Sequence, residues 1–111
     1  MNLKIGQKMQ NNFELQLAEL FPDLWGNDSN SDTRCRNIPI GWQIIVIDAL
    51  SEIRELSPNQ KLSHIKAKAG QLLIYPAGVG PREHEKRIFG ILRAAMMKSR
   101  NTPTELSESG L

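Results

Sequence analysis

The sequence predicts a small α+β domain in which a two-stranded antiparallel sheet is covered by helices, in the order helix, helix, strand, strand, helix. Three observations predict it: an apolar stripe at helical spacing that begins at Gly41, two short apolar segments within 62–75 separated by Gly70, and a second helical stripe after Pro81. A chain of 111 residues fits one domain with a single core. We place that domain at residues 1–102.

The N-terminal part predicts one helix followed by a loop. Pro22 ends the helix, because proline cannot continue the backbone hydrogen bonding. Residues 26–37 include a polar stretch with too little apolar surface to offset the entropy of ordering it, so we expect a mobile loop there. The helix is expected at about 8–21, where apolar residues at spacings of three and four form one face: Met9, Phe13, Leu17, Leu20 and Leu24.

The second helix is the expected core helix. An apolar stripe at helical spacing runs from Trp42 to Leu56 and ends at Ser57-Pro58. Ile44 and Ile47 widen the apolar arc beyond a single stripe. This wider arc predicts a helix that is packed on two sides.

Two strands and a third helix complete the domain. Leu62–Lys68 alternates apolar and polar residues and Leu72–Tyr75 is short and apolar, which predicts an antiparallel pair. Such a pair is marginal alone, so helices or a second copy must support it, and edge pairing into a homodimer is one expectation. Residues 103–111 lack periodicity and are expected to form a flexible C-terminal tail. The last helix begins at Pro81, and its buried face is expected to hold Ile88, Ile91, Leu92, Ala95 and Ser99.

The composition excludes several classes of protein. Hydrophobic residues make up 40% and charged residues 23%, and no apolar run is long enough to cross a bilayer. The first residues contain no apolar block that ends in small residues, so we expect a cytoplasmic location. Cys35 is the single cysteine, which excludes an intrachain disulfide and leaves a zinc site without its other sulfur ligands. We therefore expect neither a metal nor a cofactor.

Several short motifs resemble a family of small uncharacterised proteins of phages and prophages. The family pattern is roughly G-W-x-D-L-I-D-x-L, then Q-[VI]-K-E-K-F-G-x-L-R-F-Y, then S-x-x-T-C-E-x-C-G. The resemblance covers about residues 20–111 and implies an origin on a mobile element without naming a reaction. The matching motifs are Gly41-Trp42, Asp48-Ala-Leu50, Glu52-Ile53, His64-Ile-Lys-Ala-Lys-Ala-Gly70, Leu72-Leu-Ile-Tyr75 and Ser99-Arg-Asn-Thr102.

The departures from that pattern concern its cysteine and polar positions. Pro103-Thr-Glu-Leu106 stands where the family has Cys-x-x-Cys, so any metal site that the family builds there is absent. Ala67 replaces an acidic residue, Ala69 a phenylalanine and Leu73 an arginine. The resemblance therefore implies a shared scaffold with altered surface chemistry.

The sequence contains no recognisable catalytic constellation. Cys35 would need a neighbouring base to act as a nucleophile, and His64 and His84 are the imidazoles available. Three carboxylates lie along one flank of the core helix, where a solvated helix face explains them better than acid–base chemistry does. They are Asp48, Glu52 and Glu55. We therefore expect that the protein is not an enzyme.

The last helix contains the strongest functional signal. Between residues 82 and 100 it has six Lys or Arg against two Glu. At about 100° per residue, four of the basic residues share one side, in a line that suits a phosphate backbone. These four, Arg82, Lys86, Arg93 and Arg100, are called the basic stripe below. Arg87 and Lys98 occupy a neighbouring strip, and Lys66 and Lys68 would extend the stripe if the fold brought them alongside.

Two apolar side chains accompany the basic stripe. Phe89 and Met97 lie beside it, and apolar groups next to cations are typical of protein interfaces. The first hypothesis is therefore a non-enzymatic interaction module that binds a host or phage protein. The alternative is an accessory protein that binds nucleic acid through the basic stripe. The sequence does not identify the partner.

Overall fold

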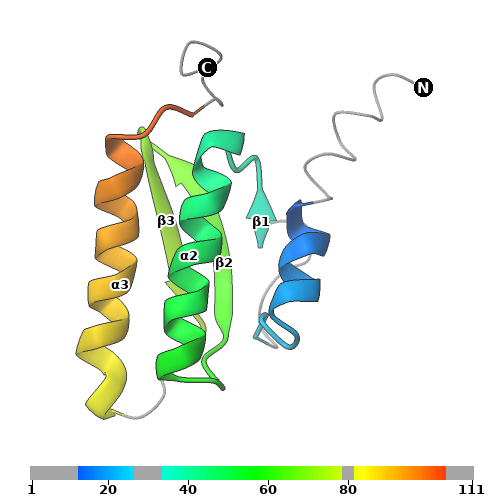
Figure 1. The fold of residues 1–111 in the computed structure, drawn as a ribbon, viewed down its shortest axis with the longest axis vertical. Coiled ribbons are helices and arrows are strands. Elements are labelled where there is room, and N and C mark those ends of the chain that lie inside the picture. Colours follow the sequence, from blue (N-terminus) through cyan, green and yellow to red (C-terminus); the bar gives the residue numbers. More distant parts are fainter. Residues whose placement is uncertain (1–12, 27–33, 79–81, 105–111) are drawn as a thin grey trace.

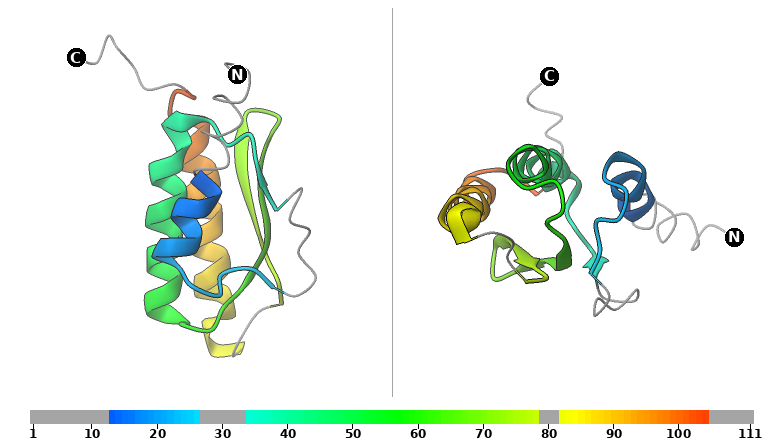
Figure 2. Two further views of the ribbon diagram at one scale, coloured as in Figure 1. Left: turned by 90° about the vertical axis from the view of Figure 1, so that its right-hand side faces the viewer. Right: turned by 90° about the horizontal axis from the view of Figure 1, so that it is seen from below.

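The protein is represented by a computed structural model that describes residues 13–26, 34–78 and 82–104. Two long helices lie side by side against one face of a sheet, and the first helix lies on the β1 side of α2 (Figures 1 and 2). The predicted order and the antiparallel strand pair are both confirmed. The elements are β1 (Cys35–Arg36), α2 (Ile40–Leu56), β2 (Leu62–Lys68), β3 (Gln71–Pro76) and α3 (Arg82–Arg100), preceded by a first helix over 13–20.

The sheet has one strand more than the sequence predicts. Its order is β1-β2-β3, and the two-residue β1 pairs in parallel with β2. The Gly26 N–H donates to the Leu62 carbonyl at 2.8 Å, and the Ile65 N–H donates to the Arg34 carbonyl at 2.6 Å. The predicted loop 26–37 is therefore too long at both ends, because these residues satisfy backbone groups on the second edge of β2. The middle of that loop lies outside the described residues.

The first helix buries a slightly different face from the predicted one. Phe13, Leu17 and Phe21, spaced four apart, are buried, whereas Leu20 is 51% exposed. The helix ends at residue 20, and the turn that follows, with Asp23 at a φ of 61°, carries Phe21 into the core. Leu20 is left at the rim as a consequence.

The central helix α2 is the core helix, as predicted. Its exposure pattern corrects one detail, because Ile47 packs partly against the core while Ile44 is 59% exposed. The expectation that both residues sit in a face packed on two sides is wrong for Ile44, since the outer face of α2 is covered by no other described element (Figure 2). The buried residues of α2 are Gly41, Trp42, Ile45, Val46, Ala49, Leu50 and Ile53.

A bulge in β2 sets which side chains enter the core. Leu62 and Ile65 are 1% and 0% exposed although they lie three residues apart, a spacing that places side chains on opposite faces of a regular strand. The register shifts between Leu62 and His64, and this extra residue returns both apolar side chains to the same face. The hairpin then turns at Ala69 and Gly70, with φ angles of 53° and 76°, as a two-residue type I′ turn requires.

The C-terminal segment caps the start of α2. Pro39 at the N-cap makes no side-chain hydrogen bond to the helix. The Gly41 N–H instead donates to the Thr104 carbonyl at 2.9 Å, and the Trp42 indole N–H donates to the Thr102 carbonyl at 3.0 Å. The Thr104 carbonyl therefore replaces the usual side-chain cap, and the Thr102 carbonyl holds the Trp42 ring.

This closure requires a glycine and corrects the predicted tail. A Cβ atom built on Gly41 would lie 2.0 Å from the carbonyl oxygen of Pro103, a contact that no side chain tolerates. The predicted flexible tail 103–111 therefore starts too early, since Thr104 is hydrogen-bonded to α2. The remainder of that tail lies outside the described residues.

A buried hydroxyl joins α3 to the free edge of β3. Ser99 is 1% exposed, and its Oγ accepts from the Leu72 N–H at 2.8 Å while donating to the Met96 carbonyl at 2.6 Å. Backbone N–H groups alternate between the two edges of a strand, so the next residues that face this edge are Ile74 and Pro76. Ile74 has an N–H to donate, whereas Pro76 has none. The Leu72 N–H is therefore not available to a strand of a second copy, and the edge pairing into a homodimer stays a prediction.

The close approach at Gly41 predicts a position-specific loss of stability. We expect Gly41→Ala to lower the free energy of unfolding by about 1–3 kcal/mol, because the new methyl group must displace the backbone of Pro103. Urea unfolding followed by circular dichroism measures it. The matched control is Gly90→Ala in α3, where a Cβ would meet nothing within 4 Å, and which should gain about 0.5–1 kcal/mol. Equal stability of the two variants would contradict the assigned role of Gly41.

The Ser99 hydroxyl provides a second test. We expect Ser99→Ala to cost about 1–3 kcal/mol, because it leaves the Leu72 N–H buried without an acceptor. Amide hydrogen exchange at Leu72 should accelerate in the variant. Ser51→Ala is the control, since the exposed Ser51 hydroxyl only bonds the Ile47 carbonyl of its own helix. An unchanged exchange rate at Leu72 would mean that another group protects this edge.

Candidate interaction surfaces

The structure gathers most of the basic stripe around one depression on α3. This depression is shallow and open, with a volume of about 770 Å³. Arg100 lies further along the helix, with its Nη1 atom 3.8 Å from the Met97 sulfur. The residues that line the depression are Arg82, Glu83, Glu85, Lys86, Phe89, Gly90 and Arg93.

Large apolar side chains are exposed among these cations. Phe89 is 46% and Met97 is 45% exposed. Within the described residues the ion pair present is Arg34 with Glu14, so the cations of α3 make none there. An exposed aromatic ring and a methionine beside arginines match the composition of protein interfaces. The predicted association of Phe89 and Met97 with the basic stripe therefore holds in space.

The two lysines of β2 do not join this surface. They flank Ala67, whose partner Leu72 is buried beneath the helices, so Lys66 and Lys68 lie on the other face of the sheet. The Lys66 ammonium instead lies 5.3 Å from the centroid of the Tyr75 ring. The fold thus separates these lysines from the basic stripe by the thickness of the sheet.

The open face of the sheet also carries His64. Its ring stacks on Tyr75 with the centroids 4.2 Å apart. Burial lowers the pKa of His64, and the nearby Lys66 ammonium lowers it further. The imidazole is therefore neutral at pH 7 and acts here as a packing group.

Cys35 is unsuited to act as a nucleophile. Its side chain is 6% exposed on β1, where it pairs in register with Ile65. Burial raises the pKa of the thiol to about 12, and the Glu14 carboxylate raises it while Arg34 opposes the effect. The thiol is consequently protonated near neutral pH, and a protonated thiol is a poor nucleophile.

Neither His64 nor His84 lies in a group of described side chains that suits a metal ion. Among the described residues, no group of three or more His, Cys, Asp and Glu side chains is arranged to hold an ion. None of the helices in the described part of the chain has both the length and the apolar character needed to cross a bilayer.

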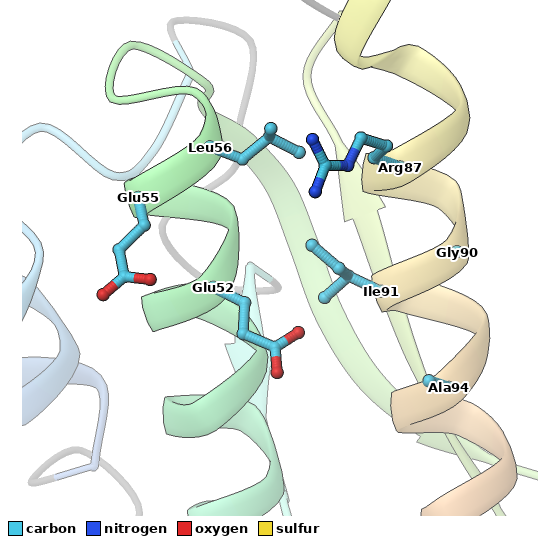
Figure 3. A pocket seen from close by; sticks show the side chains of 7 residues that line it. All are labelled: Glu52, Glu55, Leu56, Arg87, Gly90, Ile91 and Ala94. Carbon is cyan, nitrogen blue, oxygen red and sulfur yellow. The ribbon is translucent and has the colours of Figure 1, made fainter.

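Sequence reasoning missed a groove between α2 and α3. The groove has a volume of about 630 Å³, and a smaller hollow of about 180 Å³ continues it past Asp48 and Lys98. The Glu52 side chain extends toward α3 and Arg87 extends toward α2, whereas Glu55 points away (Figure 3). The groove is lined by Glu52, Glu55, Leu56, Arg87, Gly90, Ile91 and Ala94.

A signal for this groove was present in the sequence. The three carboxylates on one flank of α2 and the strip formed by Arg87 and Lys98 were both visible. That these two sets of charges line one groove depends on how α2 and α3 lie side by side. In the structure Asp48 and Glu52 of α2 face the strip of α3 that carries Arg87 and Lys98. Helical periodicity gives the angular position of each residue on its own helix, but not the neighbouring helix that it faces.

Comparison with known proteins adds no relative to this picture. No protein-family model matches the chain, and neither the curated proteins nor the solved structures give a match. The resemblance to the phage family therefore stays a prediction from the motifs. Two of those motifs, Gly41-Trp42 and the one that ends at Thr102, are in contact through the Trp42 indole.

The buried thiol predicts a specific loss of stability at high pH. The pKa of Cys35 is about 12 in the folded chain against an ordinary value of 9.0, so the unfolded chain ionises first as the pH rises. The stabilisation is complete below pH 9.0 and is lost as the pH rises toward 12. Between about pH 10 and 11, the free energy of unfolding should fall by about 1.4 kcal/mol more in the wild type than in Cys35→Ala. The two chains differ only at Cys35, so parallel curves would contradict the buried thiol.

Proposed function

We propose that this chain is a non-enzymatic interaction module that binds an acidic protein segment through the outer face of α3. The observation that carries the proposal is the exposure of Phe89 and Met97 among cations that form no ion pair in the described chain. A partner would place an apolar side chain against Phe89 and carboxylates against Arg82, Lys86 and Arg93.

The composition of the surface favours a protein over a nucleic acid. Glu83 and Glu85 line the same depression as the arginines and interrupt the continuous positive field that a phosphate backbone favours, whereas a protein segment can place a few carboxylates against the cations alone. Lys66 and Lys68 lie on a different face, so the cations available to one duplex or strand are few. An exposed phenylalanine contributes to a protein interface by burial, whereas reading a phosphate line does not require it.

The wider part of the proposal rests on the environment of Cys35 and on the sequence motifs. A buried, protonated Cys35 supports a role without nucleophilic catalysis. The motifs that resemble phage and prophage proteins support an origin on a mobile element, with a host or phage protein as the partner. The outer face of α3 is the surface that we assign to that partner.

The proposal predicts that changes on the outer face of α3 abolish partner binding. Tagged protein is used to capture partners from a bacterial lysate in the presence of nuclease, and the bound proteins are identified by mass spectrometry. With the purified partner, Phe89→Ala and Arg93→Glu should each lower the affinity at least about tenfold, or about 1.4 kcal/mol. Lys68→Glu is the matched control, because it makes the same change of charge on the open face of the sheet.

Two results would contradict this proposal. If the captured material is lost on nuclease treatment, the basic stripe binds nucleic acid instead, and the affinity should then fall steeply with salt. An equal loss of affinity in Lys68→Glu and Arg93→Glu would show that net charge, rather than the α3 surface, determines binding.

A further inference from the structure

The groove between α2 and α3 has one acidic wall and one basic wall. Asp48 and Glu52 line it from α2, and Arg87 and Lys98 line it from α3. All four residues are exposed. In Figure 3 the Glu52 carboxylate and the Arg87 guanidinium extend toward the opposite helix. The groove between α2 and α3 therefore has a strip of negative side chains on α2 beside a parallel strip of positive side chains on α3.

These charges form no ion pair with another described residue. The described residues contain the ion pair of Arg34 with Glu14, and Glu52 and Arg87 form no such pair across the groove. Charges of opposite sign that line one groove without pairing are available to a binding partner. A partner that pairs with both strips must itself carry positive and negative side chains, spaced as far apart as the two strips are.

The floor of the groove suits the close approach of another helix. It is formed by Leu56, Gly90, Ile91 and Ala94, and Gly90 and Ala94 are both exposed. Gly90 lies inside a helix, where glycine costs about 0.5–1 kcal/mol relative to alanine, yet a Cβ there would meet nothing within 4 Å. No contact within the described chain explains this glycine. One turn before Asp48 on α2, Ile44 extends the apolar surface with a side chain that is 59% exposed.

We propose that this face binds a second copy of the chain, about a two-fold axis that runs parallel to α2 and α3. Such an axis places α2 of one protomer against α3 of its partner at the same height. The strip of Asp48 and Glu52 on α2 then meets the strip of Arg87 and Lys98 on α3 twice, once on each side of the axis. A self-complementary patch of this kind is what an isologous interface requires.

Charge selects this axis over the other arrangement of the same two faces. A two-fold axis lying across the helices would bring α2 against α2 and α3 against α3. Carboxylates would then face carboxylates and cations would face cations, which is unfavourable. The first helix lies on the β1 side of α2 and does not cover this face (Figure 2). The basic stripe occupies another side of α3, and Gly90 is the residue that lines both the depression and the groove.

Sedimentation equilibrium of the full chain tests the interface. We expect a species of twice 12.5 kDa for the wild type at about 100 μM. Glu52→Arg and Arg87→Glu should each raise the dissociation constant at least about tenfold, because each creates two like-charge contacts. An equimolar mixture of the two variants should restore the dimer, since both contacts become attractive in the mixed pair. A chain that carries both changes should likewise dimerise.

The controls separate this interface from the other surfaces. Arg93→Glu lies on the outer face of α3 and should leave the dimer intact while weakening the protein partner of the preceding proposal. If either single variant fails to fold, Asp48→Lys and Lys98→Glu provide a second exchange of charge in the same groove. A wild type that is monomeric at about 1 mM, a dimer that survives both single variants, or a mixture that stays monomeric would overturn the proposal.

Discussion

The fold depends on how β2 is hydrogen-bonded along both of its edges. A strand pair alone is marginal, and here one edge of β2 pairs with β3 while the other is satisfied by the backbone around Gly26 and Arg34. The bulge after Leu62 then directs Leu62 and Ile65 toward the same side. Both long helices, α2 and α3, can therefore cover one face of the sheet, where they share a single core with the first helix.

That one-sided arrangement determines where the charged surfaces lie. Because the helices occupy one face, Lys66 and Tyr75 remain on an open face that is separate from α3. The helix layer has an outer surface of its own, with the depression around Phe89 on one side of α3 and the groove beside α2 on the other. One helix thus serves two surfaces of different chemistry, of which one is cationic with an aromatic ring and the other holds charges of both signs.

Much of this arrangement was predictable from local pattern. The stripe from Trp42 to Leu56, the alternation in β2 and the buried positions of α3 all follow from periodicity, because each amphipathic element buries its own apolar side. The two-residue β1 was not predictable, since its pairing depends on the second edge of β2 rather than on its own composition. The capping of α2 by the Thr104 carbonyl was also not predictable, because it joins Gly41 to a residue far away in the sequence.

The sequence by itself determined the identity of the helices and the hairpin, the single core and the presence of a basic stripe with Phe89 and Met97 beside it. These properties are local, because side-chain spacing sets them within one element. Only the tertiary structure decided that Lys66 is removed from the stripe, that Cys35 is buried with a raised pKa, and that Glu52 and Arg87 line one groove. Those facts depend on which faces of separate elements meet, and this is fixed by packing across the whole core rather than by any single segment.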